Sequence, residues 1–251
     1  MGVKMKKYKY LLCILSFLTL LGLIQINNYE KLNEFNHNFV LETMKEETEK
    51  NEENSNTYQE EITSLQQEYN NQDVIGTLEI LNTDYKVPIV QGTDNSYYLK
   101  HLPNKEYSIM GSIFLDYRVN INNSKKLLIY GHNDRRIEMP FAILENYYDE
   151  SYLNNHKYVE IKTKEKVRKY EIFSIFIETS DYSYMKVNFE NDNYLNHLNM
   201  LKNKSMFPMD SELTSDNNIL LLQTCSTHKD YLQYKKKYLV LAFKEINNLE
   251  N

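Results

Sequence analysis

Two residues capable of nucleophilic chemistry follow short apolar runs. Cys225 comes at the end of NILLLQT, and His132 follows LLIYG. A cysteine thiolate attacks carbonyl carbons, and a nearby imidazole moves the proton that acyl transfer requires. If both runs are strands, their ends hold the two side chains at the rim of a sheet. The sequence therefore predicts an acyl-transfer pair made of Cys225 and His132.

The chain has six histidines, so the choice of His132 needs a reason. His228, three residues after Cys225, is the rival, but it lies in a polar loop, whereas His132 follows an apolar strand and a glycine. The others are predicted to lie in the stalk or on the solvated surface: His37, His101, His156 and His197. Cys225 and His228 lack the second Cys or His pair of a zinc site, so no metal is predicted.

The N-terminal residues predict a membrane anchor. Four of residues 1–9 are lysines, and an uncharged apolar run follows from Tyr10 to Ile26. This run has the length of a membrane-spanning helix, and NNYEK after it does not resemble a signal-peptide cleavage site. The lysines place residues 1–9 in the cytoplasm and the rest of the chain outside. Cys13 lies within the run, so Cys225 has no partner for a disulfide outside the membrane; a buried structural thiol is the alternative reading.

Beyond the anchor, the composition divides the chain again. Residues 27–72 are rich in Glu, Asn, Gln and Lys, which predicts a helical stalk whose second helix packs on the domain. The catalytic domain is expected over 73–251. A net charge of -6 argues against nucleic-acid binding, because neutralising phosphates requires clustered Lys and Arg.

The domain reads as mainly β with helical insertions. Eight β-type runs separated by turn residues predict a β-barrel or sandwich: VIGTLEI, YKVPIVQ, GSIFLDY, KLLIY, YVEIK, VRKYEIFSIFIE, NILLLQT and YLVLAF. Helix-like inserts are expected at residues 95–101, 139–148, 151–156 and 191–204. Pro88 predicts an edge or the end of a ladder, because proline donates no hydrogen bond.

The motif LLQTC, with YGH about ninety residues before it, resembles the sortases, the cell-wall transpeptidases of Gram-positive bacteria. Other stretches are similar to class B: IGTLEILNTDYKVPIVQGTDNSYYLKH, EYSIMGSIFLDYR, YGHND and FAILENYYDESYLNNHKYVEIKT. The resemblance covers about residues 73–245. It implies an eight-stranded sortase barrel with a helix between its sixth and seventh strands.

The resemblance implies roles for individual residues. Cys225 would attack the Thr carbonyl of a C-terminal sorting motif, and His132 would act first as acid and then as base. The Ser226 backbone N–H would stabilise the oxyanion. The positions of Asn95, Tyr130, Gln223 and Thr224 match those that line the family's substrate groove. The implied partners are surface proteins with a sorting signal and a peptidoglycan amine, and no cofactor is implied.

One position departs from the family pattern, because no Arg follows Cys225 where sortases place one on the last strand. Alignment on Ala242 puts Lys237 there, whereas counting from Cys225 favours Lys235. Lysine supplies charge without the planar fork of arginine, so altered activity is expected. Arginines elsewhere could substitute: Arg118, Arg135, Arg136 and Arg168, of which Arg135 is favoured.

Two alternatives to a transpeptidase remain. A cysteine peptidase would hydrolyse the same acyl intermediate, although papain-like enzymes place the Cys before the His, the reverse of the order here. A catalytically impaired surface scaffold would account for the missing Arg.

Overall fold

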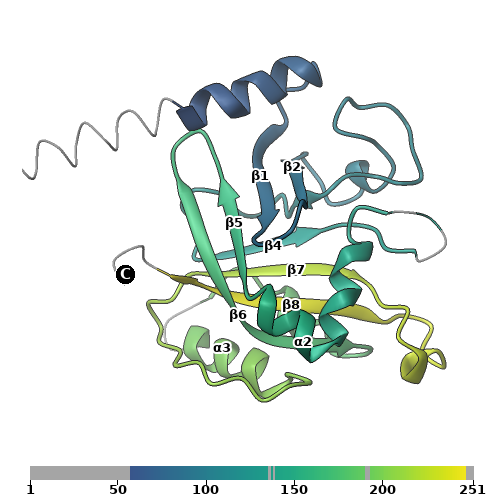
Figure 1. Ribbon diagram of the computed structural model, residues 1–251, viewed down its shortest axis with the longest axis vertical. Helices are drawn as coiled ribbons and strands as arrows, with labels where there is room; N and C mark the ends of the chain where they lie inside the picture. Colours follow the sequence, from purple (N-terminus) through teal and green to yellow (C-terminus); the bar gives the residue numbers. More distant parts are fainter. Residues whose placement is uncertain (1–56, 135–136, 138, 190–192, 247–251) are drawn as a thin grey trace, which may run out of the picture. The chain divides into compact units, whose positions relative to one another are not determined.

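The computed structural model describes residues 57–134, 137, 139–189 and 193–246. The predicted basic segment 1–9, the anchor 10–26 and most of the stalk lie outside these ranges. The described residues contain an eight-stranded closed barrel in the order β1-β2-β3-β4-β7-β8-β6-β5 (Figure 1), which confirms the predicted fold class. The strands are β1 Val74–Ile80, β2 Lys86–Val90, β3 Phe114–Leu115, β4 Lys126–Tyr130, β5 Tyr158–Lys162, β6 Val167–Glu178, β7 Ile219–Cys225 and β8 Tyr238–Ile246.

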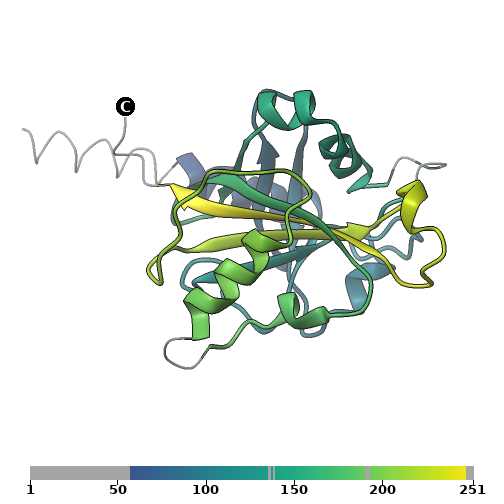
Figure 2. The ribbon, with the colours of Figure 1, turned by 90° about the horizontal axis from the view of Figure 1, so that it is seen from below.

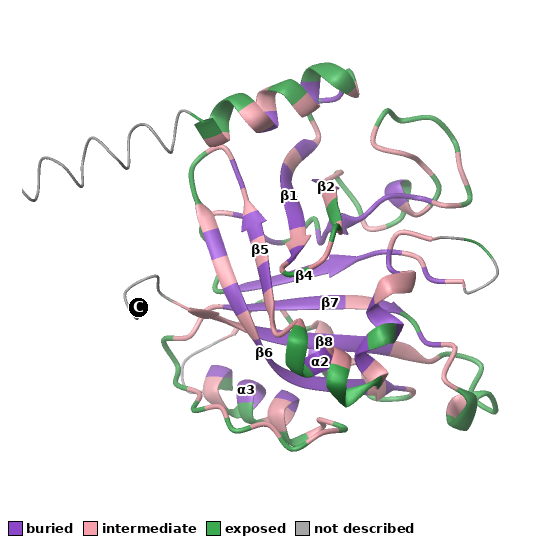
Figure 3. Ribbon diagram, in the orientation of Figure 1, coloured by how far each residue is buried: buried purple, intermediate pink, exposed green. Residues whose placement is uncertain are grey.

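Strands β4, β7 and β8 are buried on both faces. Leu127 and Ile129 of β4 belong to a core cluster drawn from all eight strands, the barrel interior. Leu128 and Tyr130 belong to a second cluster on the outer face, beneath α3 (Asn193–Asn203) and η3 (Tyr182–Met185). A strand covered on both sides reads as a continuous apolar run, as LLIY and ILLL do. Figure 3 shows this burial along the middle strands.

Two features of the ladder follow from local sequence. Pro88 pairs with Thr77 of β1, but β2 meets β3 only at Val90 opposite Phe114. Pro88 thus lies beyond the end of that ladder, as predicted. The predicted run GSIFLDY shrinks to the two residues of β3, because the Asp116 carboxylate accepts from the Arg118 backbone N–H at 3.0 Å and turns the chain.

Two of the predicted helical inserts form shorter 3-10 turns, η1 Tyr97–Leu99 and η2 Ala142–Tyr148. The other two form the α-helices α2 Glu150–Asn155 and α3, and the structure adds the unpredicted 3-10 turns η3 and η4 Lys229–Tyr231. Asp149 caps α2 by accepting from the Tyr152 N–H. In the chain α3 follows β6 and precedes β7, where the resemblance implied a helix, and Figure 2 shows it packed against the barrel strands. Its buried residues have the spacing of an amphipathic helix: Tyr194, His197, Leu198 and Leu201.

The prediction of a solvated His197 is wrong. This ring is 7% exposed, and its Nε2 lies 2.9 Å from the Lys126 ammonium. His197 lies on the buried face of α3. The polar residues around it in the sequence give no sign of this burial.

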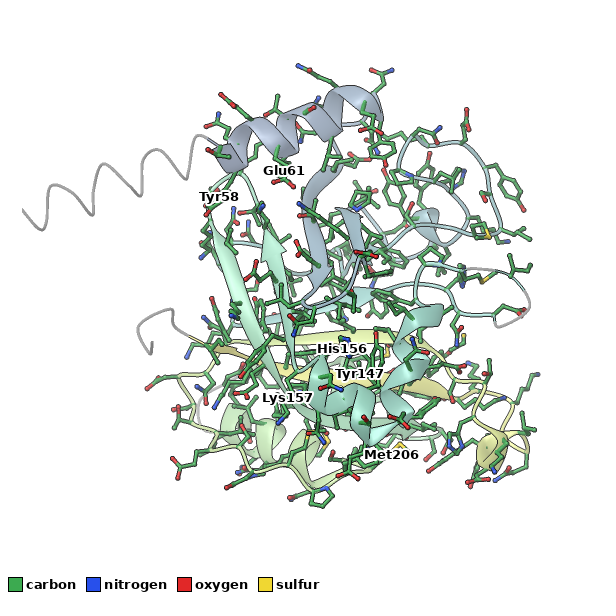
Figure 4. The ribbon with its side chains drawn as sticks, viewed as in Figure 1. Tyr58, Glu61, Tyr147, His156, Lys157 and Met206 are labelled. Carbon is green, nitrogen blue, oxygen red and sulfur yellow. The ribbon has the colours of Figure 1, made fainter. Side chains whose placement is uncertain are left out.

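Residues 57–68 are helical and pack on the barrel, in agreement with the predicted second stalk helix. Ile62 is fully buried, and Glu61 forms ion pairs with Lys86 at 2.5 Å and Lys162 at 2.9 Å (Figure 4). The compact unit thus begins before residue 73. Within the described ranges, no helix has the length and apolar character needed to cross a bilayer.

Candidate active site

The ends of β4 and β7 bring the predicted pair together. The strands run parallel with Tyr130 opposite Gln223, and the Gly131 N–H donates to the Gln223 carbonyl at 3.2 Å. Further along, Asn133 Nδ2 donates to the Cys225 carbonyl oxygen at 2.9 Å. Because parallel neighbours end at the same edge of the sheet, Cys225 and the residue after Gly131 emerge side by side.

Cys225 and His132 line one cavity of about 340 Å³ on the outer face of the barrel, called the site cavity below. Its remaining lining residues come from η1, η3 and four strands or their flanks: Asn95, Leu99, Phe114, Tyr130, Gly131, Met185, Gln223, Thr224 and Tyr238. All four predicted substrate-groove residues are among them, whereas Ser226, predicted to stabilise the oxyanion, is not. Most of the predicted site residues therefore line the site cavity.

The orientation of His132 is fixed by backbone contacts. Its Nε2 lies 2.7 Å from the Leu99 carbonyl oxygen, which can only accept, so Nε2 carries the proton. Gly111 makes room for the ring: a Cβ there would lie 3.0 Å from the His132 Cδ2, and its φ of +60° suits glycine. The imidazole is therefore held in one tautomer with Nδ1 left as an acceptor.

The rival His228 occupies a different environment. Its ring packs edge-on against Tyr148 at 4.8 Å and Tyr231 at 5.7 Å, and its Nδ1 accepts from the Asp230 N–H at 3.3 Å. It does not line the site cavity. This geometry favours His132 as the partner of Cys225.

The thiol of Cys225 is open to solvent on one side and crowded by protein on the other. Burial raises its pKa, whereas the positive charge of Lys237 acts in the opposite direction. Protonated thiol is therefore the favoured form at neutral pH, and attack on a carbonyl requires a base.

Of the two candidate lysines, Lys237 is the one whose backbone lies beside the strand end that carries the nucleophile. Tyr238 pairs with Cys225, and the Lys237 carbonyl accepts from the Ser226 N–H at 3.0 Å. The Lys237 ammonium donates to the Tyr234 carbonyl at 3.2 Å. Lys235 lies exposed in the loop before it.

The arginines suggested as substitutes do not reach the thiol where the structure describes them. Arg118 forms an ion pair with Asp116 at 2.6 Å. Arg168 forms one with Glu245 at 2.7 Å, near the end of β8 that lies away from Cys225. Arg135 and Arg136 lie outside the described residues.

Ser226 differs from its expected arrangement. Its backbone N–H, predicted to bind an oxyanion, is engaged by the Lys237 carbonyl, and its hydroxyl lies 2.8 Å from the Tyr148 hydroxyl. The residue is 4% exposed. The Ser226 N–H reaches a substrate only if its bond to Lys237 opens.

Sequence reasoning missed a buried carboxylate behind the site cavity. Asp116 accepts from the Tyr130 hydroxyl at 2.8 Å and from Asn95 Nδ2 at 3.0 Å, and Arg118 donates to both of its oxygens. Burial raises the Asp116 pKa, but these hydrogen bonds outweigh it and hold the pKa below its usual value. A charged Asp116 thus orients Tyr130 and Asn95. The D-x-R spacing in FLDYR was the available signal.

The segment 184–186 that forms the η3 wall was also missed. Lys126 donates to the carbonyl oxygens of Tyr184 and Lys186, and Arg118 donates to that of Met185. The Tyr184 hydroxyl donates to Gln223 Oε1 at 2.8 Å. Two buried or half-buried basic side chains, Lys126 and Arg118, therefore hold three successive carbonyls of this segment.

Comparisons with known proteins agree with this geometry. A model of the sortase domain matches residues 78–245. The chain is 35% identical over 164 residues to sortase B of Listeria monocytogenes, covering 64% of this chain and 66% of that protein. It is 31% identical over 174 residues to sortase B of Staphylococcus aureus, covering 68% and 70%.

Solved structures give the same answer. The Clostridium perfringens sortase B structure superposes with a TM-score of 0.66 at 33% identity, covering 74% of this chain and 99% of that one. A Staphylococcus aureus sortase B–substrate complex gives 0.66 at 30% identity, covering 74% and 85%. The closed barrel and the Cys and His at paired strand ends agree with these relatives. The chain therefore belongs to class B of the sortase family of cysteine transpeptidases.

Proposed function

We propose that this protein cleaves a sorting signal after its Thr and transfers the acyl group to an amine of peptidoglycan. The observation that carries the proposal is that Cys225 and His132 line one cavity at two hydrogen-bonded strand ends. The Staphylococcus aureus relative, solved as a sortase B–substrate complex, supports a substrate-binding role for this barrel.

The geometry supports the following sequence of steps. The Cys225 sulfur loses its proton to His132 and attacks the Thr carbonyl carbon, forming the C–S bond. His132 returns the proton to the departing amine as the peptide C–N bond breaks. An incoming amine then attacks the thioester, gives a proton to His132, and releases Cys225 as a new C–N bond forms. The positive charge of Lys237 favours the thiolate in each half-reaction.

A cleavage assay over a library of sorting-motif peptides tests the proposal. The chain is expected to cleave a Thr-containing motif, and an added amine is expected to convert the acid product to an amide adduct. Cys225→Ala removes the nucleophile, and His132→Ala removes the proton carrier. A folded chain that cleaves no peptide contradicts the proposal, and hydrolysis without any amide adduct identifies a peptidase.

We also propose that residues 10–26 anchor the protein as a single-pass span, with residues 1–9 in the cytoplasm and the barrel outside. The lysines before the apolar run support this orientation. Protease added to intact protoplasts is expected to degrade the barrel. Full protection of the barrel would contradict the proposed topology.

A further inference from the structure

The loop between β7 and β8 carries a local excess of positive charge. Residues 228–237, HKDYLQYKKK, hold four lysines against one aspartate, in a protein of net charge -6. Lys229, Lys235 and Lys236 are exposed, and within the described ranges none of them forms an ion pair or side-chain hydrogen bond. By contrast, Lys86 and Lys204 are paired with carboxylates. This cluster is free to meet an external anion.

The same loop exposes large apolar groups. Leu232 is 65% exposed and Tyr234 is 43% exposed. Figures 1 and 2 show the loop, with η4, projecting beyond the barrel at the end where β7 finishes. Lysines that surround an exposed Leu and Tyr match a lipid interface, where phosphates meet hydrocarbon. A purely polar polyanion would leave Leu232 in water.

We propose that residues 229–236 bind the anionic surface of a lipid bilayer. Lys229, Lys235 and Lys236 contact the phosphate headgroups, while Leu232 and Tyr234 enter the interface. Attraction to anionic lipid acts within a Debye length, so the contact weakens at high salt. Since the loop begins just after Cys225, this contact holds the site cavity at the bilayer surface. The inference does not depend on which reaction the site performs.

The chain has no tryptophan, which provides a selective test. Leu232→Trp puts a single indole at the tip of the loop in the full chain, reconstituted in nanodiscs of phosphatidylcholine or of phosphatidylcholine with phosphatidylglycerol. Brominated acyl chains are expected to quench this indole in the phosphatidylglycerol discs, with a blue shift of its emission. Tyr107→Trp is the matched reporter, because Tyr107 is 69% exposed on another loop, and its emission should stay that of water.

Charge is tested with a second pair of variants in the Leu232→Trp chain. Lys229→Gln, Lys235→Gln and Lys236→Gln together should weaken the contact roughly a hundredfold, the factor that three lysines supply at an anionic lipid surface. Lys125→Gln, Lys157→Gln and Lys166→Gln remove the same charge elsewhere and should leave quenching unchanged. Circular dichroism verifies that each variant folds.

Several results would overturn the proposal. One is a Leu232→Trp emission that stays solvent-like in both kinds of disc. Another is equal quenching in both, which would exclude headgroup charge as the cause. A third is a Leu232→Trp emission that does not change with the bilayer but shifts when a soluble polyanionic polymer is added. That result would assign the surface to a polyanion instead of a membrane.

Discussion

The Thr224 hydroxyl donates a hydrogen bond of 2.8 Å to the Gly131 carbonyl oxygen. Each residue immediately precedes one member of the reactive pair, Cys225 or His132. Thr224 is 1% exposed, so water does not compete for this bond. The distance between the thiol and the imidazole therefore depends on a buried hydrogen bond that takes no part in the reaction itself.

Thr224→Val tests this dependence. The change preserves shape but leaves the Gly131 carbonyl without its side-chain partner, so the free energy of unfolding should fall by about 1 to 3 kcal/mol. Peptide cleavage should slow as well, because the strand ends can separate. Urea unfolding and steady-state kinetics measure the two effects. Thr214→Val, in a surface loop, is the control, and equal stability of both variants would contradict the argument.

Lys237→Gln should raise the Cys225 pKa further, because it removes the positive charge that opposes burial. The pH midpoint for alkylation of the thiol should then move upward, and alkylation at neutral pH should slow. Lys237→Arg retains the charge and should keep the original midpoint. Lys235→Gln is the matched comparison. A larger shift from Lys235→Gln than from Lys237→Gln would assign the missing Arg position to Lys235.

Lys126→Met should destabilise the wall beside the site cavity. Burial lowers the Lys126 pKa well below its usual value, so methionine relieves a desolvation cost. The Tyr184 and Lys186 carbonyls and His197, however, lose their hydrogen-bond donor. Leaving these buried acceptors unsatisfied costs more free energy than the desolvation of Lys126 that methionine relieves. We expect a net loss of roughly 2 kcal/mol in unfolding free energy.

The same variant should raise KM more than it lowers kcat, because the held segment contributes Met185 to the cavity lining and supplies no group to the proton transfer. The neighbouring Lys125→Met, at an exposed position, controls for charge. A kcat that collapses while KM stays constant would show that the wall acts on the chemistry instead.

His197 predicts a particular pH dependence of stability. Burial and the charges of Lys126 and Lys186 lower its pKa to about 3, against a usual value near 6.5. Between these values the unfolded chain binds a proton that the folded chain does not. Stability should therefore fall as pH falls through this window, by about 1.4 kcal/mol per unit at most from this residue. Unfolding of His197→Gln at pH 7, 6 and 5 should show a flatter profile, and an unchanged slope would contradict it.

Strands were predictable where the apolar pattern alone decides them. VIGTLEI, KLLIY, YVEIK and VRKYEIFSIFIE match β1, β4, β5 and β6 at both ends. GSIFLDY failed because the Asp116 side chain competes for the backbone of its own neighbours. The predicted helices at 95–101 and 139–148 became 3-10 turns, since short segments take their form from what they pack against.

The candidate site was predictable only in part, for a physical reason. Position at a strand end pointed to Cys225 and His132 without knowledge of their surroundings. Asp116 and Lys126, in contrast, acquire their importance from partners that packing brings near, and a polar residue in sequence gives no sign of burial. The choice between Lys235 and Lys237 depended on the path of the loop before β8, and a loop has no repeating hydrophobic pattern from which its path can be predicted.

The pairing of β4 with β7 joins residues 93 positions apart, farther than any other strand pairing in the barrel. Closing so long a loop carries a large entropic cost, which slows the formation of such contacts during folding. We expect hairpins such as β5 with β6 to form first. The thiol then meets its imidazole only once this strand pairing, the most distant one in the described barrel, has closed, so partly folded molecules carry a cysteine without its histidine.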